Sequence, residues 1–346
     1  MKYNIIPHTN IKVSKICLGT MTWGNQNNKK EAFDQLDFAI DKGVNFIDTA
    51  ELYPVPADAK TSGRTSEIIG QWLKQKKNRD KLVIATKIAG PGEYTKHIRT
   101  GGFSPKSIED AINKSLKRLQ TDYIDLYQLH WPERTTNFFG VRDYKHNYKE
   151  KWNDNFKEIL QSLNRFVKEG KIRRIGISNE KAWGSMRYIE ESNKFDLPRI
   201  VTIQNAYSLL NRPFEGDLAE ISIREGLGLL AYSPLGFGVL SGKYINGTAS
   251  KNSRLNLFPR FGSRYCSNEA TNATREYLQI ALDNKLSLTQ MALAFVNQQP
   301  FVTSNIIGAT NLTQLKENIS SIDINLNEEI LNKINEVHSK IPNPSP

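Results

Sequence analysis

Runs of aliphatic residues recur eight times along this chain of 346 residues, and segments with helical spacing separate them. The eight runs span residues 16–20, 45–50, 82–87, 124–130, 172–179, 200–207, 228–234 and 304–309. Most of them lack polar alternation, which is typical of parallel strands buried on both faces. Between two of these runs, Ile112, Leu116 and Leu119 recur at spacings of four and three and predict an amphipathic helix. Eight alternating strand and helix units predict a closed (β/α)8 barrel, the TIM-barrel fold.

The chain is longer than the roughly 250 residues of a typical barrel of this kind, and the surplus falls in recognisable places. The predicted helices cover residues 30–43, 65–75, 104–120, 155–170, 182–194, 218–226, 288–299 and 312–322. Residues 1–15 predict an N-terminal hairpin, and residues 327–340 a C-terminal helix. Long loops are expected after the fourth strand, at 131–154, and after the seventh, at 235–275. With no linker in between, residues 1–346 are interpreted as one barrel domain.

An open doubly wound sheet is the rival architecture, and it requires a glycine-rich fingerprint between a strand and a helix. The only approximate match is Gly-Leu-Gly-Leu-Leu-Ala at residues 226–231. This segment precedes and enters a strand, whereas the fingerprint must follow one. The open sheet is therefore rejected.

Composition excludes several other classes of protein. Apolar residues make up 38% of the chain, yet no run is long enough for a membrane helix, and no signal peptide is expected. Cys17 and Cys266 are too few and too far apart for a disulfide framework or a zinc site, which suits a reducing cytoplasm. The net charge is +11, but the basic run at 74–81 lacks aromatic residues and is interpreted as a solvated helix end. We therefore expect no metal, no membrane and no nucleic-acid partner.

Ionisable side chains stand at the ends of three consecutive strands, where a barrel of this type carries its chemistry. Asp48 ends the second strand, Lys87 the third and His130 the fourth, while Tyr53 follows in the loop after the second. Each has an ordinary structural explanation alone, such as capping, surface exposure or core packing. Together they suit proton delivery to a developing alkoxide, because an ammonium near a phenol favours the phenolate. None of them is a reductant, so a cofactor must supply the hydride.

These residues lie in segments that resemble the aldo-keto reductase family: DTAELY at 48–53, ATK at 85–87 and LYQLHWP at 126–132. The resemblance extends over essentially the whole chain and is closest to the bacterial Tas-like branch of the family. It implies a (β/α)8 barrel, NADPH and reversible reduction of aldehydes or ketones. It also implies that Tyr53 is the general acid, that Lys87 and Asp48 tune its acidity, and that His130 positions the carbonyl.

The same resemblance assigns a cofactor site. It comprises Ser178, Asn179, Gln204, Tyr232, Ser233, Leu235, Gly238, Lys243, Arg254, Thr310, Gln314, Glu317 and Asn318. The first three match residues that bind the nicotinamide amide, and Tyr232 matches the aromatic residue that stacks on its ring. Residues 233–243 resemble the segment that covers the pyrophosphate, and the last four match contacts to the adenosine.

The chain departs from the family where many members carry a Lys-Ser pair and a later arginine. Ala309, Thr310 and Gln314 occupy this segment instead. Charge for a 2′-phosphate must then come from Arg254 or Lys243, and NADPH is favoured over NADH. A second departure is the insert at 54–64, which alters the rim of the pocket.

Trp23 and Trp131 are the predicted substrate contacts, with Phe138 and Phe139 from the loop after the fourth strand. The predicted partner is a small carbonyl compound, and the sequence gives no indication of oligomeric state. A cofactor-binding regulatory subunit with little turnover remains the alternative. A sugar-phosphate isomerase is rejected because no glutamate closes any predicted strand.

Overall fold

The computed structural model describes residues 1–259 and 262–346, and within them eight parallel strands form a closed barrel. The strands are β3 Ile16–Gly19, β4 Phe46–Asp48, β5 Val83–Ile88, β6 Ile124–Leu129, β7 Ile172–Ser178, β8 Ile200–Ala206, β9 Gly228–Tyr232 and β10 Val302–Ile307. Each pairs with its neighbour in sequence, and β10 returns to β3 with Asn305 opposite Ile16. The predicted (β/α)8 barrel is confirmed.

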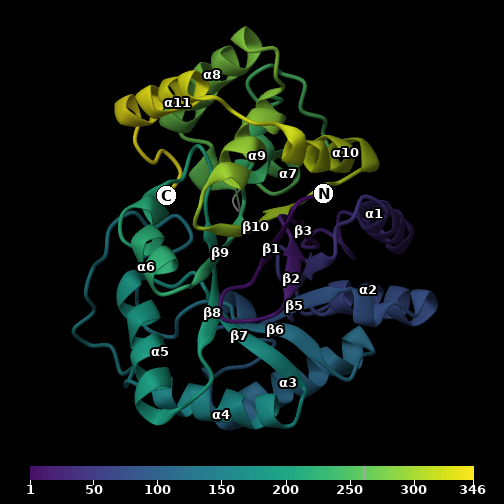
Figure 1. Ribbon diagram of the computed structural model, residues 1–346, viewed down its shortest axis with the longest axis vertical. Helices are drawn as coiled ribbons and strands as arrows, with labels where there is room; N and C mark the ends of the chain where they lie inside the picture. Colours follow the sequence, from purple (N-terminus) through teal and green to yellow (C-terminus); the bar gives the residue numbers. More distant parts are fainter. Residues whose placement is uncertain (260–261) are drawn as a thin grey trace.

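Helices surround the barrel, as Figure 1 shows for α1 to α6. The helices that follow the strands are α1 Lys29–Asp41, α2 Arg64–Lys76, α3 Pro105–Leu119, α4 Phe156–Lys168, α5 Ala182–Phe195, α6 Leu218–Arg224, α9 Leu288–Gln298 and α10 Leu312–Ser320. Their starts follow local signals, since Ser104 caps α3 before Pro105, and Asn28 and Glu31 form a capping box on α1. None of the described helices is both long and apolar enough to cross a lipid bilayer.

The N-terminal hairpin closes one end of the barrel. Strands β1 Tyr3–Ile5 and β2 Lys12–Ser14 pair antiparallel, as predicted. Ile6 and Val13 are fully buried and pack with barrel residues such as Phe46. The hairpin lies at the N-terminal ends of the strands, where Asn4 donates a hydrogen bond to the carbonyl of Thr303. The other end, where the candidate site lies, is left to the loops.

The loop after β9 is shorter than the predicted 235–275. A four-residue helix, α7 Arg254–Leu257, lies within it, and residues 260–261 are outside the described residues. Helix α8 Asn268–Asp283 begins well before residue 275 because Ser267 caps it. Its buried face is built largely from Ala and Thr, so the sequence lacks the strong apolar periodicity that predicts an amphipathic helix. Helix α8 packs beside the predicted C-terminal helix, α11 Glu328–Lys340 (Figure 1).

Candidate active site

The four ionisable side chains singled out in the sequence lie together at the C-terminal ends of the strands and are called the tetrad: Asp48, Tyr53, Lys87 and His130. Asp48 is the last residue of β4 and Lys87 lies near the end of β5, so the two point into the barrel mouth from adjacent strands. Their charged groups form a buried ion pair, with Lys87 Nζ 2.6 Å from an Asp48 carboxylate oxygen. Lys87 Nζ also lies 5.0 Å from the centre of the Tyr53 ring. The rings of Tyr53 and His130 meet edge to face, 5.9 Å apart.

The Asp48 carboxylate is held by more partners than the sequence indicated. Gln204 donates to it from β8 at 2.8 Å, and Gln128 from β6 at 3.3 Å. Lys87 gives a second hydrogen bond to the carbonyl of Thr49 at 2.8 Å. Gln128 was missed, although it stands two residues before His130 and therefore faces the same side of its strand. This network fixes the ammonium of Lys87 in place.

Burial shifts the pKa values of Tyr53, His130 and Lys87. It raises the pKa of Tyr53, with the Asp48 carboxylate adding to the rise and Arg254 opposing it. Burial and the nearby Lys87 charge hold the pKa of His130 well below its usual value. Burial also lowers the pKa of Lys87, against the effect of Asp48. In the chain alone Tyr53 is therefore a protonated phenol and His130 a neutral imidazole at neutral pH. That Lys87 makes Tyr53 more acidic stays a prediction.

The loop that carries Tyr53 is fastened to the end of β5 by Glu51. Its backbone N–H donates to the carbonyl of Lys87 at 3.1 Å, and its carboxylate accepts from the N–H of Ala89 at 2.5 Å. Arg99 completes the arrangement with two hydrogen bonds to the same carboxylate, one of them at 2.8 Å. Glu51 and Arg99 were not predicted, because an acidic residue between two motif positions carries no signal of its own.

All thirteen residues expected to hold the cofactor line one cavity of about 1080 Å³ that also reaches Asp48, Tyr53 and His130. Several of their polar groups already have partners: Asn179 donates to the His130 carbonyl, and the Tyr232 hydroxyl donates to Asn179 at 2.6 Å. Near α10, the Gln314 side chain accepts from the backbone of Thr310. These contacts order the cavity wall along its length.

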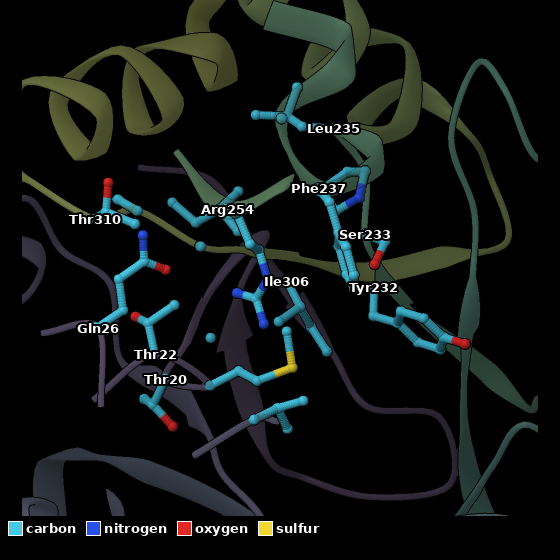
Figure 2. A pocket seen from close by; sticks show the side chains of 18 of the residues that line it. Thr20, Thr22, Gln26, Tyr232, Ser233, Leu235, Phe237, Arg254, Ile306 and Thr310 are labelled. Carbon is cyan, nitrogen blue, oxygen red and sulfur yellow. The ribbon is translucent and has the colours of Figure 1, made fainter. Parts of the chain in front are cut away.

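Lys243 and Arg254, both from the loop after β9, enter this cavity. Arg254 extends between Gln26 and Phe237 in Figure 2, with its guanidinium 4.7 Å from the centre of the Phe237 ring. Burial lowers its pKa to about 10. Lys243 lies against the turn at Gly238, whose φ of +90° favours glycine and where a Cβ would come within 3.0 Å of Lys243 Nζ. The backbone of Gly238 and the ammonium of Lys243 therefore lie side by side.

The two tryptophans predicted to contact the substrate lie in different places. Trp131 lines the cavity, packs 4.8 Å from the His130 ring and donates to the carbonyl of Pro91. Trp23 does not line it: its side chain is fully buried in the core, and its indole N–H donates to Gln35. Trp23 is therefore placed against the helix that follows rather than at the barrel mouth, which argues against a direct substrate contact. Phe139 lines the cavity, whereas Phe138 does not.

Comparison with known proteins agrees with this geometry. A sequence model of the Aldo/keto reductase family matches residues 15–339. The chain belongs to this family. It is 48% identical to "Protein tas" of Escherichia coli (strain K12), over the full length of both chains. Members of the aldo/keto reductase family are oxidoreductases that generally use NADP(H), so the closed barrel and the tetrad fit the assignment.

Two other relatives carry different names. The chain is 34% identical to "Uncharacterized oxidoreductase YrpG" of Bacillus subtilis (strain 168), across 97% of this chain and 96% of that protein. It is 30% identical to "Probable voltage-gated potassium channel subunit beta" of Arabidopsis thaliana, across 99% and 98%. The family thus includes proteins named for catalysis and proteins named for association with a channel.

Proposed function

We propose that this protein reduces aldehydes or ketones to alcohols with NADPH, and that Tyr53 donates the proton. The observation that carries the proposal is the convergence of Tyr53, His130 and the Lys87–Asp48 pair beside a cavity large enough for a dinucleotide. When bound, NADPH would supply the hydride that none of these side chains can provide.

The tetrad divides the remaining work. Neutral His130 donates a hydrogen bond to the carbonyl oxygen and orients it beside the Tyr53 hydroxyl. Tyr53 remains protonated until the oxygen becomes an alkoxide, a far stronger base than a phenolate, and then transfers its proton. The Lys87 ammonium, 5.0 Å from the ring, stabilises the phenolate that is left, and Asp48 holds Lys87 in position. The burial of all four groups strengthens these interactions by excluding water.

The donors of the cavity suit a dinucleotide. Ser178, Asn179 and Gln204 present hydroxyl and amide groups of the kind that pair with the nicotinamide amide, and Tyr232 offers a ring for stacking. Lys243 and Arg254 supply positive charge for phosphates. The N-terminus of α10, beside Thr310, offers backbone N–H groups to an anion. The two cations favour NADPH over NADH.

The experiment follows NADPH absorbance with a panel of aromatic aldehydes, for the unaltered chain and for Tyr53→Phe. The loss of the proton donor is expected to lower kcat at least about 100-fold without weakening NADPH binding. Tyr94→Phe is the matched control, because Tyr94 lines the same cavity and packs on Trp131. Equal rates for the unaltered chain and Tyr53→Phe would remove Tyr53 from its role.

A cofactor-binding regulatory subunit is the second candidate, favoured by the relatives named as potassium channel subunits. The two candidates differ in turnover and not in cofactor binding. Tight NADPH binding, seen as quenching of tryptophan fluorescence, with no oxidation of NADPH by any carbonyl compound would support the regulatory candidate.

A further inference from the structure

A second cavity, of about 840 Å³, adjoins the candidate active site. Phe139, Asn179, Tyr232 and Arg264 line both cavities, so the two share a wall. The outer side of the second cavity is formed largely by the loop after β6, from Arg134 to Tyr148. A molecule whose carbonyl lies at Tyr53 and His130 can therefore extend past this wall into the second cavity.

Arg264 is the charged residue of the shared wall. Its guanidinium donates to the hydroxyl of Tyr265, lies 4.7 Å from the centre of that ring and is also hydrogen-bonded to the hydroxyl of Tyr232. Both acceptors are phenol hydroxyls, and no carboxylate among the described residues pairs with Arg264. Arg134, in the second cavity, is by contrast neutralised by two hydrogen bonds from its guanidinium to Glu180. Arg264 thus retains uncompensated charge and further N–H donors.

The position of Arg264 separates it from the cations assigned to the cofactor. Figure 2 shows the Tyr232 hydroxyl pointing away from Arg254. Arg264 is hydrogen-bonded to Tyr232 at that hydroxyl. Lys243 lies with Arg254 in the first cavity and does not line the second. Because Arg264 lines both cavities, it can contact a substrate that extends from the first cavity into the second.

An aromatic surface connects the tetrad to Arg264. Trp131 packs 4.8 Å from His130, and Phe139 packs 5.9 Å from Trp131. Gly140 follows directly and sits on the Arg264 side chain, where a Cβ would come within 3.2 Å of the arginine Cβ. Aromatic groups therefore line the path from the reacting carbonyl to the guanidinium, which suits a flat ring with an anionic substituent.

We propose that Arg264 binds a carboxylate of the substrate, so that the preferred substrates are aromatic oxo acids: an aldehyde or ketone on a ring that also carries a carboxylate. The inference rests on the reductase function proposed above. A guanidinium matches a carboxylate in charge and in the geometry of its paired N–H groups. Among the described residues that line the second cavity, the acidic side chains are Glu150, which accepts from the N–H of Thr135, and Asp217.

The test compares 4-carboxybenzaldehyde with methyl 4-formylbenzoate, which has the same ring and aldehyde but no charge. The unaltered chain should reduce the acid with a kcat/KM about 10- to 100-fold higher than the ester. Arg264→Met should abolish this preference while leaving the rate with the ester, the Kd for NADPH and the melting temperature nearly unchanged. Arg142→Met is the matched control, because Arg142 is an exposed arginine of the same cavity, and it should keep the preference.

Other results overturn the assignment. An ester reduced as well as the acid by the unaltered chain would exclude an anion site, and loss of the preference in Arg142→Met alone would place the anion elsewhere. If neither aldehyde is reduced, the reductase function fails, and the anion site is judged by binding. Benzoate should then bind the NADP-loaded chain about 10-fold more tightly than benzamide, and equally weakly to Arg264→Met. Equal binding of benzoate and benzamide by the unaltered chain would end the proposal.

Discussion

Arg99 and Glu51 form a buried, two-pronged ion pair that holds the loop carrying Tyr53 against the end of the strand carrying Lys87. The side chain of Arg99 is 9% exposed and that of Glu51 2%, so water cannot replace either partner. The pair connects residues 48 apart in sequence.

We expect Glu51→Gln to destabilise the protein by about 3 kcal/mol, because it leaves the buried Arg99 charge without a carboxylate to neutralise it. It should also lower kcat, since Tyr53 is no longer held beside Lys87. Urea unfolding and steady-state kinetics measure the two effects. Lys114→Met, which breaks the exposed Lys114–Asp110 pair, is the control and should change stability by less than about 0.5 kcal/mol. Unchanged kcat in Glu51→Gln would show that the pair does not position Tyr53.

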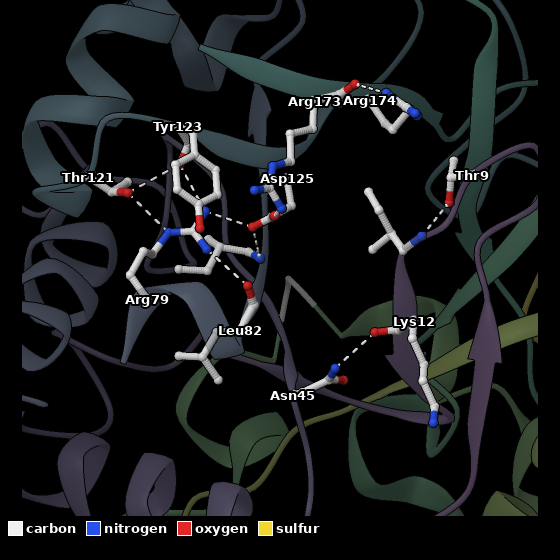
Figure 3. Close-up of polar contacts among 12 residues, drawn as sticks. Thr9, Lys12, Asn45, Arg79, Leu82, Thr121, Tyr123, Asp125, Arg173 and Arg174 are labelled. Atoms are coloured by element: carbon white, nitrogen blue, oxygen red, sulfur yellow. Dashed lines mark hydrogen bonds and ion pairs between the residues drawn. The ribbon is translucent and has the colours of Figure 1, made fainter. Parts of the chain in front are cut away.

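Asp125→Asn should damage the fold without damaging the site. Asp125 is fully buried near the start of β6, where it accepts hydrogen bonds from Arg79, Arg173 and the N–H of Ile84 (Figure 3). Removing its charge leaves two arginines unbalanced at the N-terminal end of the barrel, away from the tetrad. We expect a loss of about 3 kcal/mol in unfolding free energy, with kcat/KM within twofold of the unaltered chain at temperatures where the variant stays folded. A large fall in kcat/KM would contradict this expectation, because it would show that the N-terminal end of the barrel influences the active site.

His130 should make stability depend on pH. Its pKa in the folded chain is well below the unfolded value of 6.5, so below that pH the unfolded chain binds one proton more. The stabilisation is fully present above pH 6.5 and is lost as the pH falls towards the folded pKa, by about 1.4 kcal/mol per pH unit. His130→Gln should remove this part of the slope, measured by urea unfolding between pH 5 and 7. His97→Gln, at an exposed position, should retain it.

Lys243→Met should weaken NADPH binding about 10-fold, because a charge-assisted contact to phosphate is lost. If Lys243 serves the 2′-phosphate, NADH binding should fall much less, and fluorescence titration with both cofactors gives the ratio. Lys251→Met, on an exposed part of the same loop, is the control. Equal losses for the two cofactors would assign Lys243 to the pyrophosphate instead.

The periodicity of apolar residues predicts most of the strands and helices of the fold. The eight aliphatic runs have no polar face, so they require cover on both sides, and a closed parallel barrel provides it. Helix α8 was not predicted because its buried face is made largely of Ala and Thr, which contribute little to an apolar pattern. The tetrad could be predicted from the sequence because the C-terminal ends of the strands of a parallel barrel share one face.

Periodicity and strand ends are local properties, so the barrel, the order of its units and the four ionisable residues at its mouth could be inferred from the amino-acid sequence. The surroundings of these four residues became known only from the folded chain. Trp23 lies in the core. Gln128 and Gln204 donate hydrogen bonds to Asp48. Glu51 pairs with Arg99. Folding also raised the pKa of Tyr53 in the free chain, because desolvation and the Asp48 carboxylate outweigh the opposing charge of Arg254. Burial and long-range contact depend on distances that no local pattern encodes.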